Sequence, residues 1–323
     1  MNSTSRRQKQ KPPKSLAIPL RTRPTSVTPN HPLASQKPIA AIRAASLLAI
    51  FAGFAIAASQ ISTSAELADL ANLPSHPCPF GTPISAPSPT SAPSLIIVRP
   101  GYALAYSTDS KIALWVHEAL EASDLRGPAT RSRCSFRPDP LIPFNARAQL
   151  ADYRRCGFDR GHLAPAADFA YDQRRMQDSF FLSNVAPQIG PGFNRSLWAD
   201  LEQRARKSVP NEGVLHVITG PVFDPKIPPK KIGRRAIPVP TAFFKVLLSG
   251  RPAETPRVIA ILIPHRPFPP IPRARSNLSP FVLSVDELEV LTNLNFFPDL
   301  DALDPALEAA LESRTPPLWL KLR

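Results

Sequence analysis

The stretch that decides the fold is DYRRCGFDRGHLAPAADF, residues 152–169. Its centre, Asp159-Arg160-Gly161-His162, follows a short strand-like segment, and Gly161 relieves the backbone where the chain turns. An imidazole that is neutral near pH 7 can accept a proton from water, and a neighbouring guanidinium can contact an anionic group. These residue types therefore indicate general-base chemistry on an anionic substrate.

A second stretch, SFFLSNVAPQIGPGFNRSLWADLEQRARKS, covers residues 179–208. Pro191 and Gly192 break the chain, and a helix is expected to start near Asn194 and to continue to Ser208. The expected apolar stripe of this helix consists of Leu197, Trp198, Leu201 and Ala205. Asn194 projects near the middle of the stripe. A buried amide needs a partner, which at the first turn can be a metal ion or an ordered water. The alternative is that Asn194 is a helix N-cap.

Glu202 lies two turns further along the same helix, at the border of the apolar stripe, and Arg206 follows at i+4. Seen alone, these two residues would pass as a surface ion pair. Together with Asn194 they offer an amide ligand and a carboxylate that reaches metal-bound waters. Oxygen ligands and retained hydration are what Mg²⁺ prefers, so the pattern indicates a magnesium site.

The two stretches resemble a known family. The residues that carry the resemblance are DRGHLAP (159–165), SNVAPQ (183–188), Asn194, Trp198, Leu201, Glu202 and TGP (219–221). The pattern is similar to that of the DNA/RNA non-specific endonucleases of the ββα-metal (His-Me finger) superfamily, and most similar to the endonuclease G group and its bacterial relatives. Weaker matches extend the likeness over Ile96 to Phe297.

The resemblance implies a metal-dependent endonuclease that hydrolyses phosphodiester bonds of DNA and RNA and leaves a 5′-phosphate. In this family pattern His162 is the general base. Asn194 is the one direct protein ligand of Mg²⁺, or of Mn²⁺, and Glu202 orients a metal-bound water. In the same pattern, Arg160 and Arg206 steady the phosphate. Asn184 holds the histidine or the site loop, and Asp159 has a structural role.

Two other functions stay open at this point. One is a nuclease-fold protein that binds nucleic acid with little activity, and the other is a phosphodiesterase for another phosphate ester. The chain also departs from the family pattern in two places. The link Ile189–Phe193 is one residue longer than usual, and Cys156 stands where a small polar residue is common. An extra residue in a loop is normally tolerated, so we expect the helix to keep its place.

The segments around these stretches predict an α+β fold with a mainly antiparallel central sheet flanked by helices. Strands are expected at 95–106, 112–120, 214–223, 242–248 and 257–264, because β-branched and aromatic residues alternate or cluster there. Helices are expected at 173–178, 193–208, 285–294 and 305–313. The nuclease domain is predicted to occupy residues 95–323.

The N-terminal part divides into three segments. Residues 1–43 form a basic, Pro- and Ser-rich tail that is expected to be disordered, and residues 61–94 are expected to be, at least in part, a Pro- and Ser-rich linker. Between them, 44–60 contains fifteen residues without a charge, from Ala44 to Ala58. As a helix they would span about 22 Å, short of a hydrocarbon core of about 30 Å.

The layout of 44–60 is typical of a signal peptide, with small residues at its end. The favoured localisation is therefore export, with the domain periplasmic or attached to a membrane through 44–58. The alternative is a mitochondrial presequence, which the acid-poor, Arg- and Ser-containing composition of this part supports.

The formal charge of +14 says less about partners than its size suggests. Nine of the 39 Lys and Arg residues lie in 1–65, which contains no acid, and the rest of the chain has 30 bases against 25 acids. The three cysteines, Cys78, Cys134 and Cys156, permit one disulfide or none. The sequence does not fix the oligomeric state and leaves a homodimer open.

Overall fold

The computed structural model describes residues 78–85, 94–249, 256–269 and 277–320. The segments 1–43 and 44–60 lie outside the described residues, so the expectations for them stay predictions. Within the described ranges, no helix is both long and apolar enough to cross a membrane.

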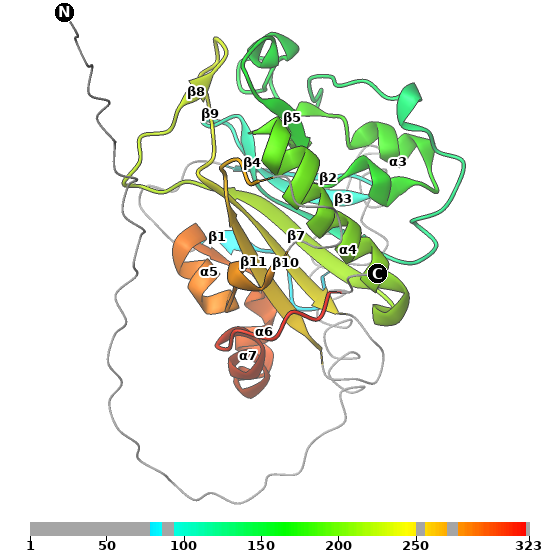
Figure 1. Cartoon of the computed structure of the whole chain (residues 1–323), viewed down its shortest axis with the longest axis vertical. Coiled ribbons are helices and arrows are strands. Elements are labelled where there is room, and N and C mark those ends of the chain that lie inside the picture. The colour runs from blue at the N-terminus through cyan, green and yellow to red at the C-terminus, as the bar shows by residue number, and fades with distance from the viewer. Residues whose placement is uncertain (1–77, 86–93, 250–255, 270–276, 321–323) are drawn as a thin grey trace, which may run out of the picture.

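A seven-stranded antiparallel sheet forms the centre of the fold (Figure 1). The order of its strands is β12-β11-β10-β7-β4-β3-β2. The strands are β2 (Ser94–Val98), β3 (Tyr102–Ser107), β4 (Ile112–Leu120), β7 (Leu215–Val222), β10 (Ala242–Ser249), β11 (Val258–Pro264) and β12 (Val282–Leu283). The predicted α+β class with a mainly antiparallel sheet is confirmed, and each of the five predicted strand regions contains a strand of this sheet.

Both faces of this sheet are buried, which explains why its inner strands are almost continuously apolar. Alternate residues of β10 belong to two separate cores. Phe243 and Leu247 pack in the core on one face, and Phe244, Val246 and Leu248 pack in the core on the other. The period of two along a strand places successive side chains on opposite faces, so one strand contributes to both cores.

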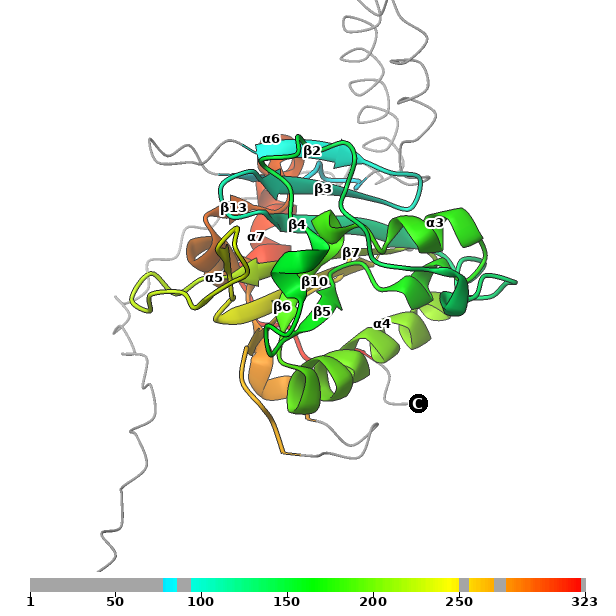
Figure 2. The ribbon, with the colours of Figure 1, turned by 90° about the horizontal axis from the view of Figure 1, so that it is seen from above.

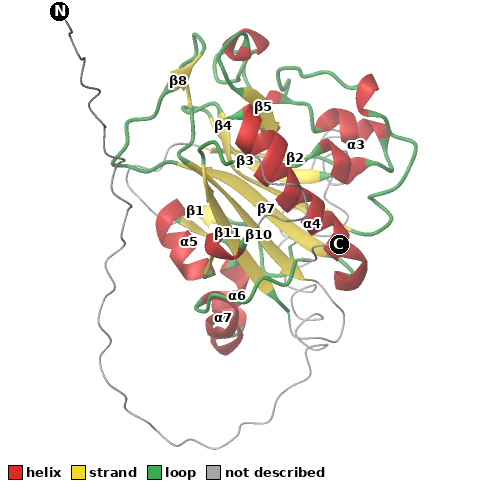
Figure 3. Cartoon of the chain, in the orientation of Figure 1, coloured by secondary structure: helices red, strands yellow, loops and turns green. Residues whose placement is uncertain are grey.

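Helices cover the two faces of the sheet. They are α3 (Gln173–Asp178), α4 (Trp198–Glu212), α5 (Val285–Thr292), α6 (Pro298–Leu303) and α7 (Pro305–Glu312). Figure 2 shows α4 on one side of the sheet and α5 to α7 on the other, and Figure 3 shows the same arrangement by type of element. The predicted helices are all present, whereas α6 was not expected from the sequence.

The helix α4 buries the apolar stripe that the sequence predicts: Leu197, Trp198, Leu201 and Ala205 are all buried. The helix continues four residues past the predicted end at Ser208, with Pro210 inside it. Contacts of Glu212 hold the last turn. Its carboxylate accepts hydrogen bonds from the Ser249 hydroxyl at 2.8 Å and from Arg257 at 2.6 Å. Tertiary contacts therefore outweigh the helix-breaking preference of proline.

Part of the predicted linker packs against the fold. Strand β1 (Ile84–Ser85) pairs with β13 (Leu294–Asn295), and Cys78 is buried in the core beneath α5 and α6. Asn293, in the left-handed conformation at φ 56°, ends α5 so that the chain can enter β13. All three cysteines are unpaired in the structure.

A large-to-small change in the core beneath α5 tests its contribution to stability. Phe244→Ala removes a fully buried ring that packs edge-on against Phe296 at 5.2 Å. We expect the free energy of unfolding to fall by about 3–5 kcal/mol, measured by denaturant unfolding. Val290→Ala is the control, because Val290 is 85% exposed; similar losses for the two variants would contradict the assignment of this core.

Candidate active site

The candidate site is built on two short strands followed by a helix. Strand β5 (Asp159–His162) pairs antiparallel with β6 (Val185–Gln188), so that His162 lies opposite Val185 and Gly161 opposite Ala186. The chain then enters α4. Gly161 cannot be replaced without disturbance, because a Cβ there would lie 2.1 Å from the side-chain oxygen of Gln188. The DRGH sequence thus forms the first strand of a ββα unit.

The link between β6 and α4, for which the sequence predicts an extra residue, is irregular. Residues Gly190–Leu197 form wide, π-type turns that are interrupted at Pro191 and at Gly192, whose φ is +80°. Gly192 is also crowded, since a Cβ there would lie 2.7 Å from the Phe268 carbonyl oxygen. After this interruption the helix follows its predicted course.

His162 is 7% exposed and lies between two phenylalanine rings. Its ring centroid is 5.1 Å from that of Phe136 and 4.8 Å from that of Phe180. The Nε2 atom is buried and makes no hydrogen bond. Burial, together with the positive charge of Arg131, lowers the pKa of His162 to about 3. The imidazole is therefore neutral at physiological pH, the protonation state that a general base requires.

Asn184 holds the turn that follows His162. Its side-chain nitrogen donates to the carbonyls of Ala164 and Ser179, both at 2.9 Å, and its side-chain oxygen accepts from the Ala164 N–H at 2.9 Å. Its backbone carbonyl also accepts from the Leu163 N–H at 3.0 Å. Because Asn184 is fully buried, these bonds fix the backbone directly after the histidine.

Asp159 connects β5 to the first helical turn after β6. Its Oδ2 atom accepts a hydrogen bond from the Asn194 side-chain nitrogen at 2.9 Å and one from Arg195 Nε at 2.8 Å. Burial opposes ionisation of this carboxyl, but the hydrogen bonds from Arg195 and Asn194 lower its pKa below the usual value. Asn194 donates to a side chain here and caps no backbone N–H, so the N-cap alternative does not apply.

Glu202 and Arg206 lie on the buried side of α4 without pairing to each other. The Arg206 guanidinium forms an ion pair with Asp168 at 2.6 Å. Burial raises the pKa of Glu202 to about 7, the charges of Lys245 and Arg206 lower it, and that of Asp168 raises it. Among the described residues, no hydrogen bond occupies the Glu202 carboxylate. It is thus a half-buried carboxylate with free oxygens.

Two buried charged residues beneath α4 were not singled out in the sequence. Glu118 and Lys245 are each 1% exposed. Lys245 Nζ donates to the Thr219 hydroxyl at 2.6 Å, and both side-chain oxygens of Glu118 lack a hydrogen-bond partner. Burial and the Asp168 carboxylate raise the pKa of Glu118 well above its usual value. A charge among apolar residues, as in AFFKVLL (242–248), was the available signal.

Two guanidinium groups lie beside the histidine. Arg160, which is exposed, lies over the Phe136 ring at 4.6 Å, and Arg131 lies over the Phe180 ring at 5.2 Å. Since both rings contact His162, the two cations flank it. Neither arginine forms an ion pair within the described part of the chain. Arg131 comes from a short 3-10 helix, Arg131–Arg133, and only the folded chain brings it here.

His265 is a further residue that the sequence did not assign to the site. Its Nε2 accepts from the Ile189 N–H at 2.7 Å, and its Nδ1 lies 2.8 Å from the Pro240 carbonyl. The carbonyl can only accept, so Nδ1 carries the proton. The ring also packs against Phe193 at 4.9 Å. His265, the residue directly after β11, therefore holds the link between β6 and α4.

The donor set around Asn194 suits a hard divalent cation. The Asn194 side-chain nitrogen donates to Asp159 at 2.9 Å, and its amide oxygen has no hydrogen bond from any described residue. Asn194, in the turns that lead into α4, and Glu202, on α4, thus each have side-chain oxygens that accept no hydrogen bond from a described residue. Magnesium takes such donors and keeps several waters. A separate acidic cluster, Asp286, Glu308 and Glu312, lies on α5 and α7 and contains none of these residues.

Residues 82–303 match the family model of the DNA/RNA non-specific endonucleases. The chain belongs to this family. Members are nucleases, hydrolases of phosphodiester bonds. The chain is 36% identical over 220 residues to mitochondrial endonuclease G of Homo sapiens, covering 65% of this chain and 72% of that protein. It is 35% identical over 222 residues to the mitochondrial nuclease of Saccharomyces cerevisiae, covering 64% and 65%.

A solved structure of the same type supports the fold assignment. A crystal structure of an EndoG/EndoGI complex superposes with a TM-score of 0.59 at 29% identity, covering 63% of this chain and 86% of that one. The non-specific endonuclease family that the sequence motifs indicated is thereby confirmed.

The neutral state of His162 predicts a pH dependence of stability. The unfolded chain protonates this residue near pH 6.5, whereas the folded chain does so only near pH 3. As the pH falls through this window, the unfolded state alone gains the proton, and stability is lost by up to about 1.4 kcal/mol per pH unit.

His162→Gln removes this contribution. The unfolding free energy of the wild type, relative to that of the variant, is therefore expected to decrease between pH 7 and pH 4 in denaturant titrations. The contributions of the other titrating groups to the unfolding free energy are the same in both proteins and cancel in the difference. A difference that stays constant with pH would contradict the buried neutral ring.

Proposed function

We propose that this chain is a divalent-cation-dependent endonuclease that hydrolyses DNA and RNA, with His162 as the general base. The observation that carries the proposal is the ββα unit itself. Asp159 and His162 share one strand, and Asp159 holds the carboxamide of Asn194 at 2.9 Å. A neutral imidazole and an unused amide oxygen are thereby attached to one rigid unit, with two cationic side chains, Arg160 and Arg131, beside the imidazole.

In the proposed reaction, His162 takes a proton from the attacking water as its oxygen bonds to phosphorus. The bond from phosphorus to the 3′-oxygen breaks, the 3′-oxygen takes a proton from solvent to become a hydroxyl, and the other product keeps a 5′-phosphate. An anionic phosphate beside the ring raises the pKa of the imidazole from its low value in the free protein. Arg160 and Arg131 contact the phosphate oxygens as bidentate donors.

Asn194 is the proposed direct ligand of Mg²⁺, or of Mn²⁺, and Glu202 binds the cation through water. When bound, the cation neutralises negative charge that develops on the phosphate and on the leaving oxygen. Arg206 is bonded to Asp168 at 2.6 Å, so we assign it to balancing the charge around Glu202 as well as that of the phosphate. Asn184 positions the backbone after His162.

The activity is tested with full-length protein on plasmid, single-stranded DNA and RNA, with Mg²⁺ or with EDTA. We expect cleavage of all three with Mg²⁺ and none with EDTA. His162→Ala and Asn194→Ala should each lower turnover by at least about 10³-fold, because they remove the base and the cation ligand.

Lys207→Gln, an exposed change on the outer side of α4, is the control and should keep full activity. Binding without cutting would support the nucleic-acid-binding alternative, and cleavage restricted to small diesters would support the phosphodiesterase alternative. Unchanged turnover in His162→Ala would remove this residue from the mechanism.

We also propose that the chain is imported into mitochondria. The relatives from Homo sapiens and Saccharomyces cerevisiae are named as mitochondrial proteins, and residues 1–65 contain bases but no acid. A fusion of residues 1–60 to a fluorescent protein is expected to coincide with a mitochondrial marker in eukaryotic cells. Fluorescence in the secretory pathway or the medium would favour the export that the apolar segment alone suggested.

A further inference from the structure

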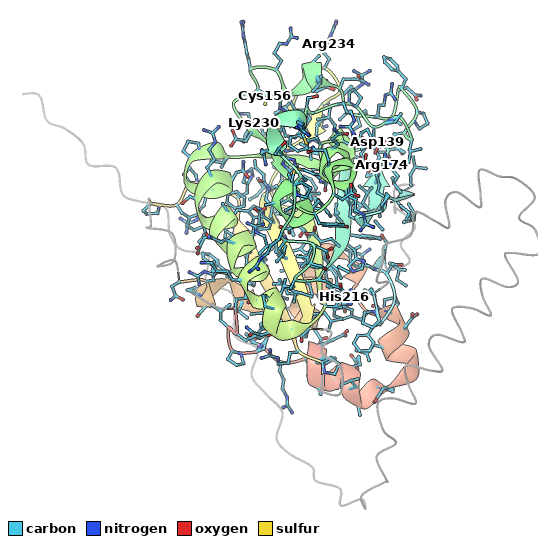
Figure 4. All side chains as sticks on the ribbon, turned by 90° about the vertical axis from the view of Figure 1, so that its right-hand side faces the viewer. Asp139, Cys156, Arg174, His216, Lys230 and Arg234 are labelled. Atoms are coloured by element: carbon cyan, nitrogen blue, oxygen red, sulfur yellow. The ribbon has the colours of Figure 1, made fainter. Side chains whose placement is uncertain are left out.

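A group of exposed cations lies next to the ββα unit, outside the residues assigned to the reaction. Segments 144–160 and 226–240 together contain nine Lys and Arg residues and two acids. We call five of the exposed cations the basic platform: Arg154, Arg155, Lys230, Lys231 and Arg234. Figure 4 shows Lys230 and Arg234 at the same end of the molecule, on either side of Cys156.

The two acids of these segments do not neutralise the platform. Asp152 is 1% exposed and accepts hydrogen bonds from the backbone N–H groups of Gln149 at 2.9 Å and Arg235 at 3.1 Å. Asp159 is engaged by Asn194 and Arg195. None of the five platform cations forms an ion pair with a described residue. Solvated protein surfaces normally intersperse both signs of charge, whereas the two acids of these segments are both engaged by other groups.

The platform is held rigidly. It includes the hairpin of β8 (Lys231–Ile232) and β9 (Ile237–Pro238), whose inward residues Ile232 and Ile237 are buried. At the turn, Gly233 has φ +65°, and a Cβ there would lie 2.4 Å from the Asp152 Cα. The hairpin therefore packs in backbone contact with the short 3-10 helix Leu150–Tyr153, directly before Arg154 and Arg155.

The same apolar cluster connects the platform to the reaction site. Ile232 and Ile237 share a cluster with Tyr153, Leu182 and Val185, and Val185 pairs with His162 across β5 and β6. Lys230 Nζ also lies 4.9 Å from the ring centroid of Phe158, the residue that precedes β5. The cations of the platform thus keep a fixed position relative to the catalytic strand.

We propose that the basic platform binds backbone phosphates of the nucleic-acid strand that extends beyond the scissile phosphate. The inference rests on the proposed function and assigns the residues that hold the strand outside the reaction centre. Binding of a polyanion releases counterions. Each phosphate contact therefore makes the slope of log K against log[salt] more negative by about 0.9. A small diester has no phosphates beyond the scissile one, so we expect it to gain nothing from the platform.

The test compares pairs of charge-neutralising substitutions in the otherwise full-length His162→Ala protein. Lys231→Gln/Arg234→Gln alters the hairpin, and Arg154→Gln/Arg155→Gln alters the adjoining loop. Binding of a fluorescein-labelled 30-base-pair DNA is followed by anisotropy from about 50 to 200 mM salt. Each pair should reduce the salt slope by about 2 and weaken binding roughly tenfold near 100 mM salt.

Lys207→Gln/Arg314→Gln is the matched control, since both residues are exposed and lie on α4 and after α7, away from β8 (Figure 1). With active protein, the platform pairs should slow cleavage of the long duplex at limiting substrate. They should leave cleavage of thymidine 3′,5′-bis(p-nitrophenyl phosphate) unchanged.

The outcomes separate the two proposals. If the platform pairs change the salt slope no more than the control pair does, while the wild type binds and cuts DNA, the platform is overturned and the endonuclease remains. If the wild type neither binds nor cuts DNA, the proposed function itself fails. Equal slowing on the small diester and on the duplex would also overturn the platform, because it would place these residues in the chemical step.

Discussion

The hydrogen bond from the Asn194 carboxamide to Asp159 joins β5, the strand that carries the histidine, to the turns that lead into α4. The acceptor is a carboxylate held in its charged form by Arg195, and charge-assisted bonds of this kind are stronger than neutral ones. An amide has one donor end and one acceptor end. Fixing its nitrogen against Asp159 therefore fixes where its oxygen points. Since Asp159 and His162 share β5, the same bond sets the position of the imidazole relative to that oxygen.

Several energetically costly features of the structure lie around this bond and around Glu202. Gly192 takes a positive φ and His265 uses both ring nitrogens to hold the link before Asn194. Beneath α4, the protein also buries Glu118 and Lys245, although burying charge is expensive unless it is compensated. With Asp168 and Arg206 they surround Glu202 by charges of both signs. A cation bound near Glu202 would add the positive charge that this acid-rich group lacks.

The charged residues fall into two groups: those buried beneath α4 and the exposed cations of the basic platform. Beneath α4, charges of both signs lie close together, although the carboxylates of Glu118 and Glu202 accept no hydrogen bond from a described residue. Outside, the five cations of the basic platform form no ion pair with a described residue, whereas the neighbouring Arg235 pairs with Asp152 at 3.9 Å. The hairpin of β8 and β9 is fixed by apolar packing to the strands of the site. Apolar contacts thus place the exposed cations, while hydrogen bonds place the reacting groups. Packing suits the first task because it is insensitive to salt, unlike the exposed charges that it positions.

The sequence by itself determined the ββα unit, the class of the central sheet and the residues His162, Asn194 and Glu202 as candidates. This was accessible because the unit spans residues 159–206 without a long excursion, and because strand and helix periodicities are local properties. Only the tertiary structure decided that Arg206 pairs with Asp168, that Arg131 and His265 reach the site, and that α4 continues past Pro210 to Glu212. These contacts join residues 38 to 76 positions apart or depend on the neighbouring strand β10. The packing of the sheet against its covering helices determines which residues meet in these contacts. A local sequence pattern contains no information about that packing.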